Sequence, residues 1–259
     1  MLHRLHTVKL SEYVLNMICV LAFMLPFAWT ITTPLIYLTI AMAIIDLVLN
    51  QKRFRRINFH GKLFLTWVVL AGLSLWQAPK LAECFYNYRV IFAQYVGLYF
   101  MAYFYIDDVR KFKRVLYALL ASSIAVSAYG IYQYMQGVAV LTQESKWVDI
   151  AQFPQLKDRV FSTLDNPNLL ATFLLMMICM VTGLLLDRPK DNKNKWFLYL
   201  VAAVNLLCLL FTFSRGAWLT LLLIMCILGV LINVRIIYIL AVIIALSLLG
   251  MHEVIIGRI

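Results

Sequence analysis

Long apolar segments alternate with short polar segments along most of the chain. A helix needs about 20 mostly apolar residues to cross the hydrocarbon core of a bilayer. Segments close to that length recur often enough to predict about nine membrane-spanning helices. We therefore expect an all-α, polytopic transmembrane helix bundle that forms a single integral-membrane domain over residues 1–259. The predicted spans are residues 12–30, 34–50, 63–79, 90–106, 115–136, 167–186, 196–213, 216–233 and 236–251.

The composition supports this prediction. Hydrophobic residues make up 64% of the 259 residues, and charged residues make up 14%. Soluble domains hold about 45–50% apolar and about 25% charged residues. The composition therefore excludes a soluble domain and indicates a multi-pass protein of a cell membrane.

The net charge of +11 reflects an uneven distribution of lysine and arginine. Basic residues are concentrated in alternate connections between the predicted spans, a bias that marks the cytoplasmic side of membrane proteins. The N terminus is therefore predicted to be cytoplasmic, and residues 137–166 are predicted to form an extracytoplasmic loop. The charge indicates topology and contact with membrane lipids, and we expect no nucleic acid partner. The basic residues on the predicted cytoplasmic side are Arg4, Lys9, Lys52, Arg53, Arg55, Arg56, Lys62, Arg110, Lys111, Lys113, Arg114, Arg188, Lys190, Lys193, Lys195 and Arg235.

Familiar catalytic and cofactor motifs are absent from the sequence. The five cysteines and four histidines do not have the spacing of metal ligands. There is no glycine-rich phosphate-binding loop, no dinucleotide fingerprint and no Gly-x-Ser-x-Gly turn. We expect neither a metal nor a cofactor, and the sequence identifies no catalytic residue.

The segment Asp165-Asn166-Pro167-Asn168 precedes the predicted span at residues 167–186. Asn is a favoured N-cap, and Pro is favoured at the first helical position because its missing N–H costs nothing there. A well-capped helix start explains the tetrapeptide by itself. The predicted topology also turns this helix N terminus outward, where free N–H groups and the positive dipole end attract an anion. Because Arg159 lies just upstream, the segment is also a candidate anion-binding site.

Ser214-Arg215-Gly216 joins two predicted spans with almost no loop, which holds Arg215 near the outer membrane surface. One interpretation is a side chain that extends to lipid phosphates. The other is a specific anionic partner, because arginine is disfavoured on this side and binds phosphate oxygens through two parallel hydrogen bonds. Arg89 precedes a third span that runs in the same direction. The predicted ligand-binding residues are Arg89, Arg159, Asn166, Asn168, Ser214 and Arg215.

Three notable polar residues lie within predicted spans: Asp46, near the predicted cytoplasmic end of its span, and Gln94 and Asn205. The last two are not ionisable. We expect both to form interhelical hydrogen bonds. The spans contain few ionisable residues, which argues against an ion-coupled transporter.

The residues around Arg159 and Arg215 resemble the O-antigen ligase and O-antigen polymerase superfamily of bacterial membrane glycosyltransferases. The resemblance rests on Arg159 with residues 162–168, the apolar span that follows, and residues 213–218 at the next outward-facing helix pair. It implies surface polysaccharide biosynthesis at the outer face of the bacterial cytoplasmic membrane. The donor would be a glycan on a polyprenyl diphosphate, such as undecaprenyl diphosphate, and the acceptor a glycan or a lipid core. The resemblance also implies that Arg159 and Arg215 contact the donor diphosphate, without a metal or a nucleotide sugar.

The end of the chain departs from the pattern of that superfamily. Its members depend on a histidine and a further arginine in a large external loop. This chain ends at Gly257-Arg258-Ile259, where that loop is expected to begin, and His252 does not match the histidine. We therefore expect either a fragment or a short natural protein, without the acceptor half of the site.

Several functional alternatives stay open at this stage. The resemblance does not separate a ligase from a polymerase. A polytopic transporter or flippase of lipid-linked sugars is a second hypothesis, although the sequence lacks the internal repeats and interrupted helices expected of one. A non-catalytic membrane partner is a third.

Overall fold

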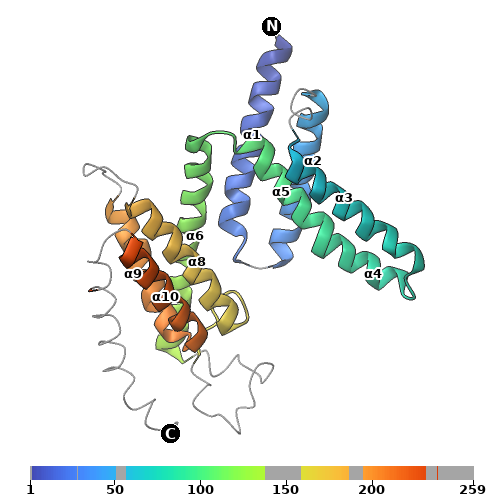
Figure 1. Cartoon of the computed structure of the whole chain (residues 1–259). Helices are drawn as coiled ribbons and strands as arrows, with labels where there is room; N and C mark the ends of the chain where they lie inside the picture. The colour runs from blue at the N-terminus through green and yellow to red at the C-terminus, as the bar shows by residue number, and fades with distance from the viewer. Residues whose placement is uncertain are drawn as a thin grey trace. The chain divides into compact units, whose positions relative to one another are not determined.

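The computed structural model describes residues 2–27, 29–50, 57–137, 159–186, 195–231 and 238, which form helices joined by turns and short irregular segments (Figure 1). These described residues contain no β-strand, which confirms the all-α prediction. The elements are α1 (Leu2–Met24), α2 (Trp29–Leu49), α3 (Phe59–Leu73), the 3-10 helix η2 (Ser74–Gln77), α4 (Leu81–Asn87), the π-helix η3 (Tyr88–Ala93), α5 (Gln94–Tyr105), α6 (Val109–Gln136), α8 (Pro167–Leu186), α9 (Lys195–Phe211) and α10 (Arg215–Leu231).

Four helical segments are long and apolar enough to cross a membrane: Thr30–Leu49, Phe59–Gln77, Val109–Gln136 and Pro167–Leu186. Three shorter apolar helices accompany them, at Leu10–Met24, Lys195–Phe211 and Arg215–Leu231. The helices have the character of a membrane protein, while the count of nine spans and the cytoplasmic N terminus stay predictions. Apart from Tyr238, the predicted span at 236–251 lies outside the described residues, as does the predicted loop between residues 138 and 158.

Several helix boundaries differ from the sequence prediction, and two of the differences have an identifiable local cause. The first helix ends at Met24, earlier than predicted, and Pro26 lies in the turn that follows. Proline ends a helix because it lacks the N–H and restricts the residue before it. The predicted span at 90–106 belongs to a longer helical stretch that begins at Leu81 and contains the π-helix η3. No residue pattern marked that irregularity in advance.

The described chain divides into two compact units, Met1–Ser122 and Ser123–Ile259. In the first unit, α1, α2 and α5 share an apolar core that includes Val14, Ile36 and Met101. The helix α5 approaches α2 closely, because a Cβ at Gly97 would lie 2.7 Å from the Cδ1 atom of Ile40. A larger residue at position 97 would force the Ile40 side chain to move, so the glycine allows these two helices to approach closely.

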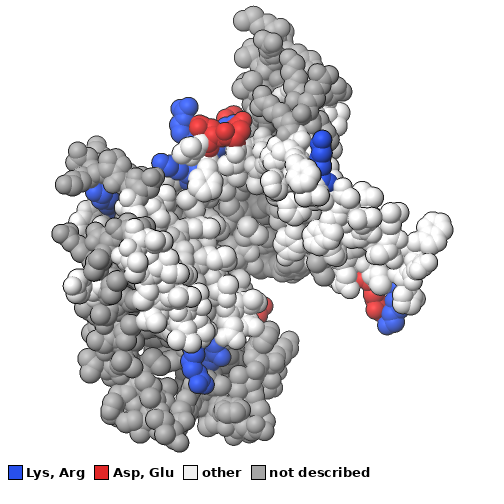
Figure 2. All heavy atoms as spheres, in the orientation of Figure 1, with Lys and Arg blue, Asp and Glu red and all other residues white. Residues whose placement is uncertain are grey.

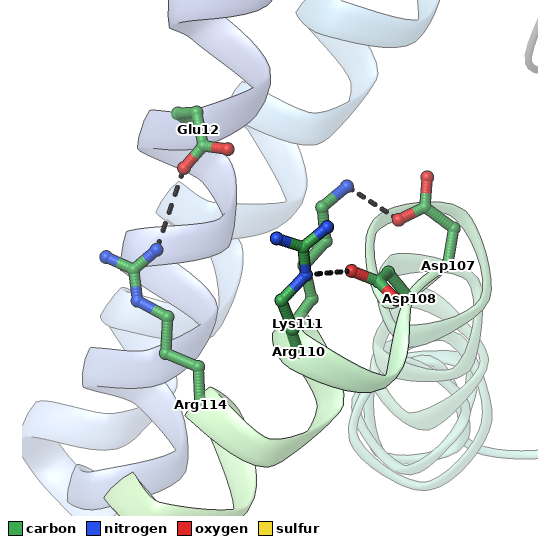
Figure 3. A network of polar contacts seen from close by, with 6 residues as sticks. All are labelled: Glu12, Asp107, Asp108, Arg110, Lys111 and Arg114. Carbon is green, nitrogen blue, oxygen red and sulfur yellow. Dashed lines mark hydrogen bonds and ion pairs between the residues drawn. The ribbon is translucent and has the colours of Figure 1, made fainter.

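Polar contacts hold the end of the first unit at the α5–α6 corner (Figure 3). Arg114 of α6 donates to Asn16 of α1 at 2.7 Å and lies 3.6 Å from Glu12. Lys111 and Arg110 pair with Asp107 and Asp108, respectively, at 2.6 and 3.1 Å. These ion pairs are partly exposed, so each contributes little to stability by itself. The charge pattern predicts that this end of the first unit faces the cytoplasm.

In the second unit, α8 packs against α9 and α10. Asn205 of α9 connects α9 to α6, since it accepts a hydrogen bond from Ser127 at 2.8 Å and donates to Ser123 at 3.0 Å. This confirms the expected interhelical hydrogen bonds of Asn205. The helices also approach closely at Gly130, where a Cβ would lie 2.7 Å from the sulfur of Cys208.

Large apolar side chains cover the outer sides of the helices in both units. Trp76, Trp196 and Val230 are 93%, 84% and 74% exposed, respectively. On the face shown in Figure 2, charged atoms gather at helix ends and uncharged atoms cover the helix sides. Such a surface suits contact with lipid, because large contiguous apolar patches are rarely exposed on soluble monomers.

Candidate functional site

The site in the second unit begins at the start of α8. Pro167 is the first residue of the helix, and the Oδ1 atom of Asn166 accepts the N–H of Asn168 at 2.8 Å and that of Leu169 at 3.4 Å. The N–H of Leu170 donates to the backbone oxygen of Asn166 at 2.9 Å. The predicted capped helix start is confirmed. The expected free N–H groups are absent from this first turn, because Asn166 accepts them, and an anion here depends on side chains and the helix dipole.

Arg159 is held by two elements of the second unit. Its Nε donates to the backbone oxygen of Thr212 at 2.8 Å, and its Nη2 donates to the Oδ1 atom of Asn168 at 2.7 Å. The neighbouring N–H of Val160 donates to the oxygen of Phe211 at 3.1 Å. The backbone at Arg159 is thus fixed to the end of α9, and its guanidinium is oriented by the first turn of α8.

A buried side chain on α6 fixes the loop that follows Arg159. Gln133 accepts the N–H of Ser162 at 2.8 Å and donates to its oxygen at 3.4 Å. The Ser162 hydroxyl donates to the oxygen of Val126 at 2.6 Å. Ser162 has a φ of 52°, a left-handed conformation that is uncommon outside glycine. Three hydrogen bonds to α6 offset the cost of that conformation and define the path of the loop.

Ser214 and Arg215 come from the tight turn between α9 and α10. Phe213 in this turn has a φ of 47°, and α10 begins directly at Arg215. The buried Ser214 hydroxyl donates to the Oδ1 atom of Asn168 at 3.4 Å. One amide oxygen therefore accepts hydrogen bonds from both Arg159 and Ser214, so that Asn168 joins the two motifs found in the sequence.

These residues surround a pocket of about 570 Å³ at the ends of α8 and α10. Two of the lining residues are arginines, and none of the ten described lining residues carries a carboxylate. The lining consists of Arg159, Asn168, Thr172, Leu175, Phe213, Ser214, Arg215, Gly216, Ala217 and Thr220. The pocket thus combines positive charge, hydroxyl groups and a short apolar wall.

Arg215 is the more available of the two cations. It is exposed, and it makes no hydrogen bond or ion pair within the part of the chain that the structure describes. Beside it, a Cβ at Gly216 would meet nothing within 4 Å, which leaves the start of α10 open. The positive end of the α10 dipole adds to the field of Arg215. An anion that enters the pocket meets one oriented arginine and one unengaged arginine.

The structure groups four of the six predicted residues in the pocket: Arg159, Asn168, Ser214 and Arg215. Asn166 caps α8 behind them, and Arg89 belongs to the first unit, so its part in this site stays a prediction. Sequence reasoning missed Thr172 and Thr220. Each lies four residues after a predicted residue or its neighbour, so helical spacing from Asn168 and Gly216 was the signal that could have found them.

The pocket has no cluster of metal-ligating groups. Among the described residues, no three His, Cys, Asp or Glu side chains lie close enough to hold a metal ion. No family model, no curated protein and no solved structure matches the chain. The family resemblance around Arg159 and Arg215 therefore stays a prediction based on those residues.

Proposed function

We propose that the protein acts in surface polysaccharide biosynthesis in a bacterial cytoplasmic membrane, by transferring or polymerising a glycan carried on a polyprenyl diphosphate. The observation that carries this proposal is the pocket with two arginines and no carboxylate among its described lining residues, set at the ends of apolar helices. The topology belongs to the proposal: about nine spans, a cytoplasmic N terminus and a pocket that opens at the outer face.

The location of the pocket favours an amphiphilic ligand. The helices α8 and α10 present apolar sides, while polar and charged groups gather at their N-terminal ends. A ligand whose chain lies in lipid can therefore place a charged headgroup beside Arg159 and Arg215. The headgroup of such a ligand would bind in the polar pocket and its hydrocarbon chain would lie in lipid. This arrangement fits a polyprenyl-linked donor better than a free anion.

The charge of the pocket favours a diphosphate. Guanidinium groups bind phosphate oxygens with paired, charge-assisted hydrogen bonds. Asn168 and Thr212 orient Arg159 through two hydrogen bonds, so little reorganisation is needed when the anion binds. The exposed Arg215 is available for the second phosphate group.

The guanidinium groups of Arg159 and Arg215 would also stabilise the leaving diphosphate during glycan transfer. In that step an acceptor hydroxyl forms a bond to the anomeric carbon of the glycan, and the bond from that carbon to the diphosphate oxygen breaks. The electron pair stays on the diphosphate, where the oriented Arg159, the exposed Arg215 and the α10 dipole stabilise the added charge. The hydroxyl proton passes to an oxygen of the departing diphosphate, because no described lining residue is a carboxylate or a histidine.

Photolabelling with a diazirine-bearing undecaprenyl diphosphate tests the proposal on the full chain in lipid vesicles. We expect labelled peptides from α8 and α10, and a roughly tenfold lower yield in Arg215→Ala and Arg159→Ala. Arg215→Lys keeps the charge but loses the paired geometry, so it should fall between the wild type and Arg215→Ala.

Arg110→Ala is the matched control for lost positive charge. Arg110 is exposed, forms an ion pair with Asp108, and does not line the arginine pocket. It should label like the wild type. Equal yields in Arg110→Ala, Arg159→Ala and Arg215→Ala would contradict a specific diphosphate site.

A further inference from the structure

We propose that the first unit carries a separate binding site for a polyhydroxylated ligand, such as a sugar ring, between α2 and the π-helical start of α5. Its residues are Thr33 and Tyr37 on α2, Arg89 on η3 and Gln94 on α5. None of them lines the arginine pocket of the second unit. The inference therefore stands whether or not that pocket binds a diphosphate.

The contacts between α2 and the η3–α5 segment show that they run in the same direction. The guanidinium of Arg89 lies 5.6 Å from the ring centre of Tyr37. Further along, Gly97 meets Ile40, and the Tyr105 hydroxyl donates to the oxygen of Ala43 at 3.2 Å. Residue numbers rise together on both helices, so Gln94 lies between the level of Tyr37 and the level of Ile40.

The π-helix brings Arg89 and Gln94 to one side. The N–H of Gln94 donates to the oxygen of Arg89, a hydrogen bond across five residues. Residues five apart lie on nearly opposite sides of an α-helix, but one wider π turn places them close to the same side. Gln94 also lies three residues before Gly97, on the α5 face that meets α2. Such π segments frequently occur at functional sites.

Three buried polar atoms in this region have no hydrogen-bond partner: Oγ1 of Thr33, the hydroxyl oxygen of Tyr37 and Oε1 of Gln94. Gln94 is only 2% exposed, so water outside the protein cannot satisfy it. Thr33 and Tyr37 are four residues apart and therefore share a face of α2. Because a buried polar group without a partner is costly, these three atoms indicate a ligand that supplies the missing hydrogen bonds.

The unsatisfied groups define the chemistry of that ligand. The oxygen of Gln94 needs a donor, whereas the hydroxyls of Thr33 and Tyr37 can donate or accept. A deprotonated phosphate provides acceptors only and would leave the Gln94 oxygen unsatisfied. Hydroxyl groups both donate and accept, so they satisfy the amide and the two side-chain hydroxyls together.

A cation lies at the edge of this region. Arg89 is exposed and has no hydrogen bond or ion pair among the described residues, although it lies over the rings of Tyr37 and Tyr86. These cation–π contacts hold the guanidinium plane at the edge of the site. A sugar ring that extends from Gln94 to Arg89 would contact the buried amide of Gln94 on one side. On the other side, its hydroxyl groups could accept hydrogen bonds from the Arg89 guanidinium.

Saturation-transfer NMR on the full chain in lauryldimethylamine oxide, a detergent without sugar, tests this site. The probes are maltose, methyl β-glucoside and N,N′-diacetylchitobiose. At least one sugar should receive saturation from the protein, with roughly fivefold weaker affinity in Tyr37→Phe, Thr33→Val and Gln94→Leu, about the factor expected for one lost hydrogen bond. Each substitution nearly preserves side-chain volume, and circular dichroism reports whether the fold is retained.

Thr39→Val is the matched control on the same helix. Thr39 is buried, and its hydroxyl already donates to the oxygen of Leu35 at 2.7 Å. It should bind the sugar like the wild type. Two results would overturn the proposal: no sugar of the panel receives saturation, which would mean that water alone fills the site, or Thr39→Val weakens binding as much as Tyr37→Phe does.

Discussion

At the residue scale, the second unit depends on the amide oxygen of Asn168. It accepts hydrogen bonds from Arg159 at 2.7 Å and from Ser214 at 3.4 Å. Sequence spacing marked each of these residues separately, through a helix start and a short turn. Their meeting at one atom could not be predicted, because Asn168 and Ser214 are 46 positions apart in the sequence and only tertiary packing joins them.

Substitutions of Asn168 should separate the effect of orienting Arg159 from the effect of the charge of the pocket. Asn168→Ala removes the acceptor for Arg159, so affinity for undecaprenyl diphosphate should fall about tenfold, in the range expected for a hydrogen bond to a charged group. Asn168→Asp keeps that acceptor but adds negative charge beside the anion, so the protein should stay folded and bind more weakly still. Isothermal titration in detergent measures both variants. Stronger diphosphate binding by Asn168→Asp than by the wild type would contradict an anion site here.

At the element scale, local rules predicted some helix ends and not others. Asn166 and Pro167 follow a rule that operates within four residues, and the structure shows the predicted cap. Asn205 was predicted to bond another helix, because a polar side chain in a span needs a partner. The same argument was wrong for Gln94, whose oxygen has no partner, and the π-helix before it has no sequence signature.

The cap of α8 should be measurable by thermal unfolding. Asn166→Ala should lower the stability of the protein by about 1 kcal/mol, because two N–H groups lose their acceptor. Asn166→Ser can cap in the same way and should restore most of that stability. An unchanged melting temperature in Asn166→Ala would show that the cap contributes nothing.

Packing of α6 against α9 gives a second prediction at this scale. Gly130→Ala places a methyl group 2.7 Å from the Cys208 sulfur and 3.0 Å from the Cγ1 atom of Val160, so it should destabilise the protein by about 1–3 kcal/mol. Cys208→Ala makes room for that methyl group, and the double variant should recover part of the loss. A double-mutant cycle in melting temperature measures the coupling, and strict additivity would contradict the contact.

At the scale of the whole molecule, composition and periodicity were enough to predict an all-helical structure with apolar helices long enough to cross a membrane. They were not enough to locate each helix end or to group the site residues across the chain. The basic residues that predict topology lie partly in the α5–α6 corner, where Lys111 and Arg114 form ion pairs. The uneven distribution of basic residues predicts the direction in which the chain crosses the membrane. This direction can be tested independently of any ligand.

Cysteine labelling in intact cells tests that direction. In a chain without its native cysteines, Gln77→Cys lies at the end of η2 and Asp108→Cys at the α5–α6 corner, both at exposed positions. A membrane-impermeant maleimide should label Gln77→Cys in intact cells and Asp108→Cys only after permeabilisation. The reverse pattern would invert the topology and place the arginine pocket in the cytoplasm.

The most direct test of the central claim is the ratio of affinities for undecaprenyl diphosphate and undecaprenyl monophosphate. Native mass spectrometry of the full chain measures both lipids in one titration. Because Arg159 and Arg215 lie at the same pocket, the wild type should prefer the diphosphate about tenfold or more, and Arg159→Ala with Arg215→Ala should abolish the preference. Equal affinity of the wild type for both lipids, or a preference that survives the loss of both arginines, would contradict the account.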